Sequence, residues 1–117
     1  MAVDLQKIEK WKQKGKVAKL IKVLSEKNLD LRLAAIEALG SIEDNDAMNN
    51  LILALRDPNP SIRAAAADAL GNMGNQRSIE FVRKLSVNDE NEDVREKASR
   101  AFLKIKERVE EKEEQTV

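Results

Sequence analysis

Residues 57–73 read DPNPSIRAAAADALGNM, and two other stretches of the chain repeat this pattern without a gap. Residues 26–42 read EKNLDLRLAAIEALGSI, and residues 89–105 read DENEDVREKASRAFLKI. The copies begin 31 and then 32 residues apart. A fixed period of about 20–50 residues is typical of repeat proteins, in which each unit buries its apolar face against the next. The spacing therefore predicts a stack of repeated units.

Each copy has the chemistry of a helix with a marked beginning. Asparagine is among the best helix N-caps, and one stands four residues before the shared arginine in every copy: Asn28, Asn59 and Asn91. Pro60 follows at the first helical position, where a missing N–H costs nothing. Gly40 and Gly71, near the ends, are predicted helix C-caps. Apolar residues spaced by three and four predict one buried stripe: Leu31, Ala35, Ala38, Leu39 and Ile42; Ile62, Ala66, Ala69, Leu70 and Met73; Val94, Ala98, Ala101, Phe102 and Ile105.

A second helix precedes each of these. Residues 16–24 (KVAKLIKVL), 47–55 (AMNNLILAL) and 78–85 (SIEFVRKL) align with one another, so each unit is predicted to be a helix–turn–helix pair. Ile8 and Trp11 lie one period before Leu39 and Ile42, which predicts a half-repeat that caps the stack. Leu103 replaces the glycine, so the last helix should run on. The predicted fold is all-α, a short α–α superhelix in one domain over 1–117: a half-repeat (3–14), helix pairs (16–42, 46–73, 77–105) and a charged helical tail (106–117).

The composition argues against an enzyme. The chain has no histidine and no cysteine, so it lacks the commonest general base, the commonest zinc ligands and the strongest protein nucleophile. We therefore expect no catalytic residues, no cofactor and no metal. The apolar runs are shorter than the roughly 20 residues of a membrane helix, and the first residues lack the apolar core of a signal peptide. We expect a cytoplasmic protein without a membrane partner.

The charges are unevenly distributed. The chain has 21 basic and 21 acidic residues, but residues 1–27 contain eight lysines and three acidic residues. Such a cluster could bind phosphate groups in a salt-dependent way, or it could be a solvated helix face. Since only one aromatic residue, Trp11, and no glycine-rich loop accompany it, we favour the solvated face and keep nucleic acid or another anionic ligand as the alternative. The lysines are Lys7, Lys10, Lys12, Lys14, Lys16, Lys19 and Lys22.

An acidic residue precedes the shared arginine by six positions in every copy. The arginines could form an anion-binding row, but their matched acids favour a structural ladder, in which each arginine bonds turn carboxylates and ties adjacent repeats together. We call these residues the acid–arginine ladder: Glu26, Arg32, Asp57, Arg63, Asp89 and Arg95. Trp11 could be a binding anchor, but its alignment with Ile42 favours a cap residue packed on the first full repeat.

The pattern of an acidic residue, an Asn/Pro-rich turn, a hydrophobic residue, Arg-x2-Ala-x2-Ala-Leu-Gly resembles the HEAT-like repeats named after the phycobilin lyases. The resemblance covers about residues 16–105 and departs at Phe102 and Leu103. It implies a protein or peptide partner, or less directly a subunit related to the bilin lyases. It also implies that the second helix of each pair lines a concave contact face, at the positions where the repeats differ: Leu33, Ile36, Glu37, Ala64, Ala67, Asp68, Glu96, Ser99 and Arg100.

Overall fold

The computed structural model of the chain describes residues 2–115. Within this range it contains seven α-helices, one 3-10 turn and no strand, as the sequence predicts. The elements are α1 (Leu5–Gln13), α2 (Val17–Val23), α3 (Leu29–Gly40), α4 (Asn45–Ala54), α5 (Pro60–Met73), η1 (Gln76–Ser78), α6 (Ile79–Asn88) and α7 (Glu92–Gln115).

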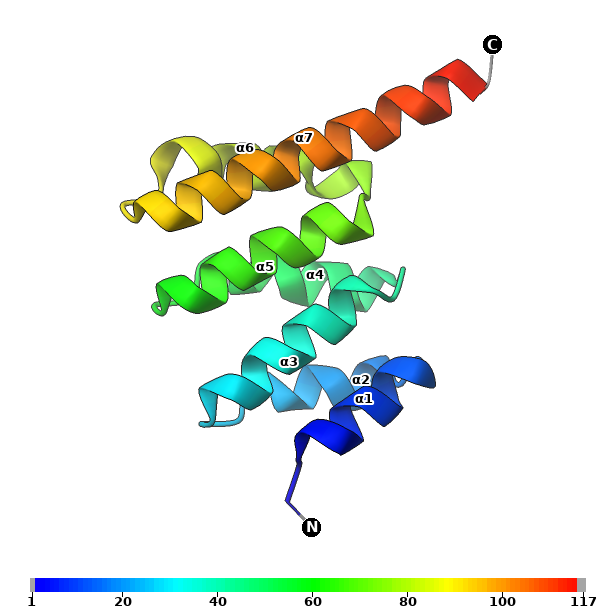
Figure 1. Cartoon of the computed structure of the whole chain (residues 1–117), viewed down its shortest axis with the longest axis vertical. Helices are drawn as coiled ribbons and strands as arrows, with labels where there is room; N and C mark the ends of the chain where they lie inside the picture. Colours follow the sequence, from blue (N-terminus) through cyan, green and yellow to red (C-terminus); the bar gives the residue numbers. More distant parts are fainter. Residues whose placement is uncertain (1, 116–117) are drawn as a thin grey trace.

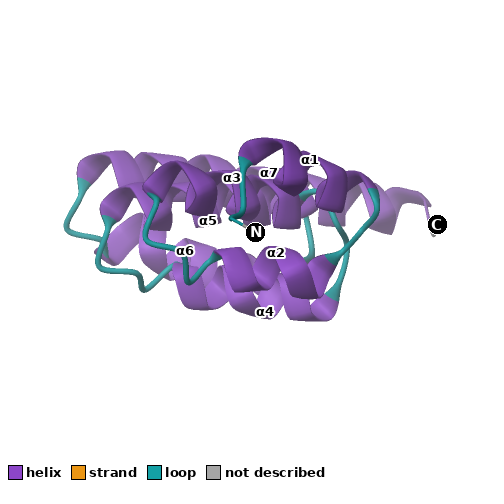
Figure 2. Ribbon diagram, turned by 90° about the horizontal axis from the view of Figure 1, so that it is seen from below, coloured by secondary structure: helices purple, strands orange, loops and turns teal. Residues whose placement is uncertain are grey.

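The helices form two layers that are stacked pair by pair. Helices α1, α3, α5 and α7 lie one above another on one side, and α2, α4 and α6 lie behind them (Figures 1 and 2). The two chain ends lie at opposite ends of this stack (Figure 1). The slab measures 50 × 35 × 17 Å, and its thickness fits two layers of helices about 10 Å in diameter. Helix α5 packs against both α3 and α7, so neighbouring repeats share one layer.

The predicted caps begin the helices of the front layer. The Oδ1 atom of Asn28 accepts a hydrogen bond from the Leu31 N–H at 3.2 Å, and that of Asn91 accepts one from the Val94 N–H at 3.1 Å. Asn59 caps α5 through the Ser61 N–H at 2.8 Å, and Pro60 occupies the first turn. Each cap satisfies a backbone donor that the helix itself leaves free. The turn chemistry read from the sequence is therefore confirmed.

The predicted stripe forms the core between the layers. Leu39 and Leu70 occupy equivalent positions in two repeats, and Ile105 lies one turn after the equivalent position in the third. These three side chains have no exposed surface. Twelve of the fifteen stripe residues are buried, whereas Leu31, Ile42 and Phe102 are half-buried. Helical spacing therefore identified the face of each helix that packs inward.

Gly40 and Gly71 are not helix C-caps, which corrects the prediction. Gly40 is the last residue of α3, which Ser41 caps, and Gly71 lies inside α5, which ends at Met73. The cap of α5 is Gly74, whose φ of 67° is left-handed. Gly40 and Gly71 instead allow the next repeat to approach. A Cβ atom at Gly40 would lie 2.7 Å from the Ala69 Cβ, and one at Gly71 would lie 2.9 Å from the Ala101 Cα.

The two ends of the stack differ in construction. Helix α1 packs on α3, with Ile8 buried and Trp11 half-buried against the core, as the alignment with the later repeats predicts. Helix α7 continues past Leu103 to Gln115, as expected from the missing glycine. Its distal part is anchored at Arg108, which donates a 2.7 Å hydrogen bond from Nη1 to the Met73 carbonyl oxygen. The last two residues of the predicted tail lie outside the described residues.

Candidate functional site

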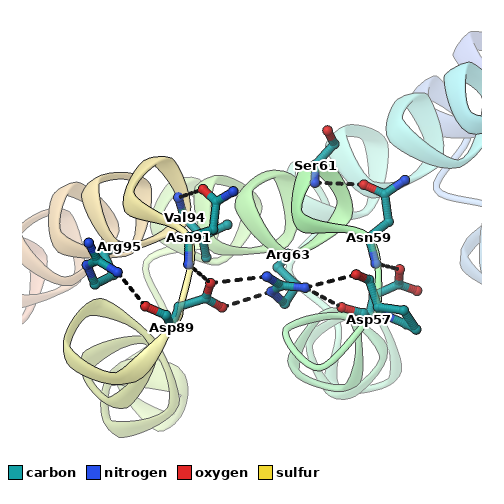
Figure 3. A network of polar contacts seen from close by, with 9 residues as sticks. Asp57, Asn59, Ser61, Arg63, Asp89, Asn91, Val94 and Arg95 are labelled. Atoms are coloured by element: carbon teal, nitrogen blue, oxygen red, sulfur yellow. Dashed lines mark hydrogen bonds and ion pairs between the residues drawn. The ribbon is translucent and has the colours of Figure 1, made fainter.

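The acid–arginine ladder joins the second and third repeats at their turns (Figure 3). The guanidinium of Arg63 donates to both carboxylate oxygens of Asp89, from Nε at 2.8 Å and from Nη2 at 3.1 Å. Its Nη1 donates to the Asp57 carbonyl oxygen at 2.9 Å and to the Pro58 carbonyl oxygen at 3.1 Å. The side chains of Arg63 and Asp89 are only 11% and 5% exposed. This two-pronged pair is charge-assisted and nearly withdrawn from water.

The electrostatics of the pair favour its charged form. Burial raises the pKa of the Asp89 carboxyl, but hydrogen bonds from Arg63 and from the Asn91 N–H, together with the charges of Arg63 and Arg95, outweigh burial and hold the pKa below its usual value. The hydrogen bond to Asp89 raises the pKa of Arg63, against the opposing effect of burial. Both partners remain ionised at neutral pH, so their chemistry is that of a structural clamp.

The ladder was expected to join arginines to turn carboxylates and to tie adjacent repeats together. Within each copy, Arg63 and Arg95 bond the backbone carbonyl oxygen of the acidic residue six positions earlier. The carboxylate partner of Arg63 belongs to the next repeat, 26 residues later. Glu26 is exposed, and no hydrogen bond or ion pair joins it to Arg32 among the described residues. Among the described residues, one buried acid–arginine ion pair therefore joins two repeats, the second and the third.

The residues of the predicted contact face do not all reach the surface. Ile36, Ala64 and Ala67 are buried, because they point toward the neighbouring helices of the stack. Leu33 is half-buried. The remaining five residues are exposed on the side formed by α3, α5 and α7: Glu37, Asp68, Glu96, Ser99 and Arg100.

A groove lies between α3 and α5 on this face. It has a volume of about 360 Å³ and is lined by Leu33 and Glu37 from α3 and by residues of α5: Ala65, Asp68, Ala69 and Asn72. The two carboxylates, Glu37 and Asp68, form no hydrogen bond or ion pair with any described residue. The small alanine side chains leave the groove shallow, with acidic groups on an apolar floor.

Ala65 and Asn72 line the groove but were not predicted from the sequence. Their helical spacing from Asp68 could have identified them. Residues 65, 68, 69 and 72 follow the i, i+3, i+4, i+7 pattern of one helix face. The predicted contact face was chosen from positions at which the three repeats differ in sequence. Those positions do not all lie on the same face of the helix. Helical geometry around Asp68 would have identified both residues.

The face becomes mixed in charge toward α7. Arg100 pairs with Glu96 one turn away on α7. The Lys104 Nζ donates to the Asn72 Oδ1 at 3.1 Å, which links α7 to the end of the groove. The charges along the face therefore change from acidic at α3 and α5 to mixed at α7.

The N-terminal lysines lie on α1, α2 and the turn between them. Lys19 places its Nζ 5.6 Å from the centre of the Trp11 ring, a cation–π contact. Lys7 donates from Nζ to the Ala2 carbonyl oxygen. Five of the seven lysines are exposed, and Lys7 and Lys12 are half-buried. Trp11 thus contacts both the core and a lysine, as a cap residue does.

Two features bear on cofactors and membranes. Across residues 2–115, no three His, Cys, Asp or Glu side chains are placed to hold a metal ion. No helix in the described part of the chain is long and apolar enough to span a bilayer.

The repeated helix pairs have a counterpart among protein families. The family model for HEAT repeats matches residues 17–102, which include α2 through most of the packed part of α7. No curated protein sequence matches the chain. The match covers well over half of the 117 residues and coincides with the stacked helix pairs. The chain belongs to the HEAT repeat family.

Proposed function

We propose that the chain is a non-enzymatic protein-interaction module whose groove between α3 and α5 binds a segment with basic and aliphatic side chains. HEAT repeats commonly mediate contacts between proteins, and fold alone does not name the partner. The observation that carries the proposal is the unpaired state of Glu37 and Asp68 beside the apolar floor of the groove.

The chemistry of the groove selects the kind of segment. Leu33, Ala65 and Ala69 offer a small apolar surface, which suits an aliphatic side chain better than a bulky aromatic one. Glu37 and Asp68 can each accept hydrogen bonds from a lysine or arginine of the partner. Exposed charge pairs contribute only about 0.2–1 kcal/mol each, so the carboxylates act mainly on partner choice and association rate.

Selection from a displayed peptide library on the immobilised chain tests this proposal. Enriched peptides should carry lysine or arginine next to an aliphatic residue. A synthetic peptide of this type should bind at least tenfold more weakly to the Glu37→Lys/Asp68→Lys variant than to the native chain. The matched control is Glu43→Lys/Glu110→Lys, which makes the same charge change at exposed residues outside the groove. Enrichment of acidic peptides, or equal loss in both variants, would contradict the proposal.

A second candidate function rests on the N-terminal lysines. None of the seven forms an ion pair with a described residue, so their charges are free to attract phosphate groups. Binding to random duplex DNA at two salt concentrations tests this alternative, because phosphate contacts weaken steeply as salt increases. Absence of binding at low salt would exclude it. A relation to bilin lyases would require bilin binding, which absorbance after incubation with a bilin would detect.

A further inference from the structure

Arg32 belongs to the acid–arginine ladder but lacks the hydrogen bonds and the ion pair that Arg63 forms. It occupies the position in α3 that Arg63 occupies in α5, one period of 31 residues later. Arg63 bonds two carbonyl oxygens and a carboxylate, whereas Arg32 forms no hydrogen bond or ion pair with any described residue. Its Nε is buried without a partner. A buried donor without an acceptor is destabilising, and more so when the group is charged. This guanidinium therefore has unused capacity to bind an anion.

A cavity lies beside Arg32, at the junction of the first and second repeats. It has a volume of about 210 Å³ and opens between α2, α3, α4 and the start of α5. Asn50 of α4 and Asp57 of the following turn lie in its wall together with Arg32. The rest of the lining is aliphatic: Leu24, Ile36, Leu53, Ala54 and Ile62. Leu53 is 65% exposed and forms the rim. The pocket therefore combines an aliphatic lining with one cationic, one anionic and one amide side chain.

We propose that this pocket binds a carboxylate attached to a short branched aliphatic group. The terminal nitrogens of the Arg32 guanidinium would bind the carboxylate, while the aliphatic group packs on Leu24, Leu53 and Ile62. The volume of about 210 Å³ fits this size, because an apolar protein cavity of about 150 Å³ is large enough to bind benzene, a six-carbon ligand. The Arg63–Asp89 pair, with distances of 2.8 and 3.1 Å, is the internal precedent.

Asp57 and Asn50 refine the choice of ligand. The Asp57 Oδ2 accepts the Asn59 N–H at 2.8 Å, which leaves its other oxygen free to accept an N–H from a ligand. The Asn50 side chain donates to the Asp46 carbonyl oxygen and retains a second N–H. Arg63 donates to the Asp57 carbonyl oxygen at 2.9 Å, so a second cation near Asp57 reduces, without cancelling, the repulsion between Asp57 and an incoming carboxylate. An N–H next to the carboxylate occurs at the C-terminal residue of a peptide and is absent from a free fatty acid.

Binding is tested on the whole chain by following backbone amide NMR signals during titration. N-acetyl-leucine represents a peptide C-terminus, and 4-methylpentanoate represents a free acid. Both should shift the signals of residues that line the pocket, with dissociation constants on the order of 1 mM for ligands of this size. Tighter binding of N-acetyl-leucine would assign the site to a peptide terminus, and tighter binding of 4-methylpentanoate would assign it to a free acid. N-acetyl-leucinamide, which lacks the charge, should bind at least tenfold more weakly.

Two variants separate loss of the site from loss of the fold. Arg32→Gln removes the guanidinium but no observed bond, and Leu53→Asp places a negative charge at the exposed rim. Each should weaken N-acetyl-leucine binding at least tenfold with an unchanged circular dichroism spectrum. Arg83→Gln, at an exposed arginine of α6 outside the pocket, is the matched control and should bind as the native chain does. Glu37→Lys/Asp68→Lys should also leave this binding intact, which distinguishes the site from the α3–α5 groove.

A direct pair between Arg32 and Asp57 would overturn the proposal. Such a pair would repeat the Arg63–Asp89 contact and would fill the place of the ligand. A double-mutant cycle of Arg32→Gln and Asp57→Asn measures it. We expect the two substitutions to be additive in the unfolding equilibrium. A coupling as large as that of Arg63 and Asp89, or equal binding of N-acetyl-leucine and its amide, would refute the carboxylate site.

Discussion

Gly71 of α5 lies directly against Ala101 of α7, so closely that a Cβ atom at Gly71 would be 2.9 Å from both the Cα and the Cβ of Ala101. Gly40 stands in the same relation to Ala69 one repeat earlier. The third residue in this series is Leu103, which is 54% exposed because no further helix of the described chain packs on it. Within the described residues, glycine therefore stands where the helix of another repeat packs closely, and leucine stands where none does.

The first prediction concerns this contact. Gly71→Ala should destabilise the fold by about 1–2 kcal/mol, because overpacking against backbone costs about 1–3 kcal/mol and the better helix propensity of alanine returns up to about 1 kcal/mol. Urea unfolding followed by circular dichroism measures the change. Leu103→Ala, at the equivalent exposed position, should change stability by no more than about 0.5 kcal/mol. If Gly71→Ala were stabilising, the glycine would not be required for the approach of α7.

The second prediction concerns the pair between Arg63 and Asp89. Arg63→Gln and Asp89→Asn should each destabilise the chain by about 2–4 kcal/mol, because either change leaves a nearly buried charge without its partner. The two changes should couple by about 1–3 kcal/mol in a double-mutant cycle of urea unfolding. Additive effects would show that the pair does not hold the second and third repeats together.

The third prediction follows from the pKa of Asp89, which lies below the ordinary value of 3.8. A carboxyl with a lowered pKa in the folded state contributes stability above its unfolded pKa, and this contribution is lost as the pH falls through the folded value. The stability difference between the native chain and Asp89→Asn should therefore be full at pH 6 and shrink below about pH 4. Urea unfolding at pH 6 and pH 2.5 measures it. In the Arg63→Gln background, the same comparison should show a much smaller change with pH.

Much of this fold could be predicted because its signals are local and repeated. Asn59 and Pro60 indicate a helix start because asparagine is a strong N-cap and proline suits the first helical position. The stripe of Ala66 and Leu70 follows from helical spacing. Gly40 and Gly71 were wrongly predicted to be C-caps. A glycine near the end of a helix looks the same in the sequence whether it caps the helix or allows another helix to approach closely. Only the distance from Gly71 to Ala101, across 30 residues of sequence, separates the two roles.

The candidate sites were less predictable, because they depend on which repeats meet. The sequence indicated a ladder that ties adjacent repeats together, but it did not specify that the carboxylate of Arg63 comes from Asp89 of the following turn. The Arg32 pocket depends on a missing bond, which three similar copies of a motif cannot reveal. The sequence placed Arg108 in a charged helical tail without a contact, because α7 alone extends this far and no other repeat offered a comparison.

The last prediction concerns Arg108, which attaches the end of α7 to the end of α5. Its Nη1 donates to the Met73 carbonyl oxygen at 2.7 Å, and its side chain covers Gly74, the left-handed cap of α5. A cation near a helix C-terminus satisfies a free carbonyl group and interacts favourably with the helix dipole. Arg108→Ala should therefore destabilise the chain by about 1 kcal/mol.

Lys106→Ala removes a charge from an exposed position on the same helix and should change stability by at most about 0.5 kcal/mol. Amide hydrogen exchange gives an independent measurement, because loss of this contact should speed exchange in residues 106–115 and leave the core of α5 protected. Equal stability of the two variants would mean that the end of α7 does not support α5.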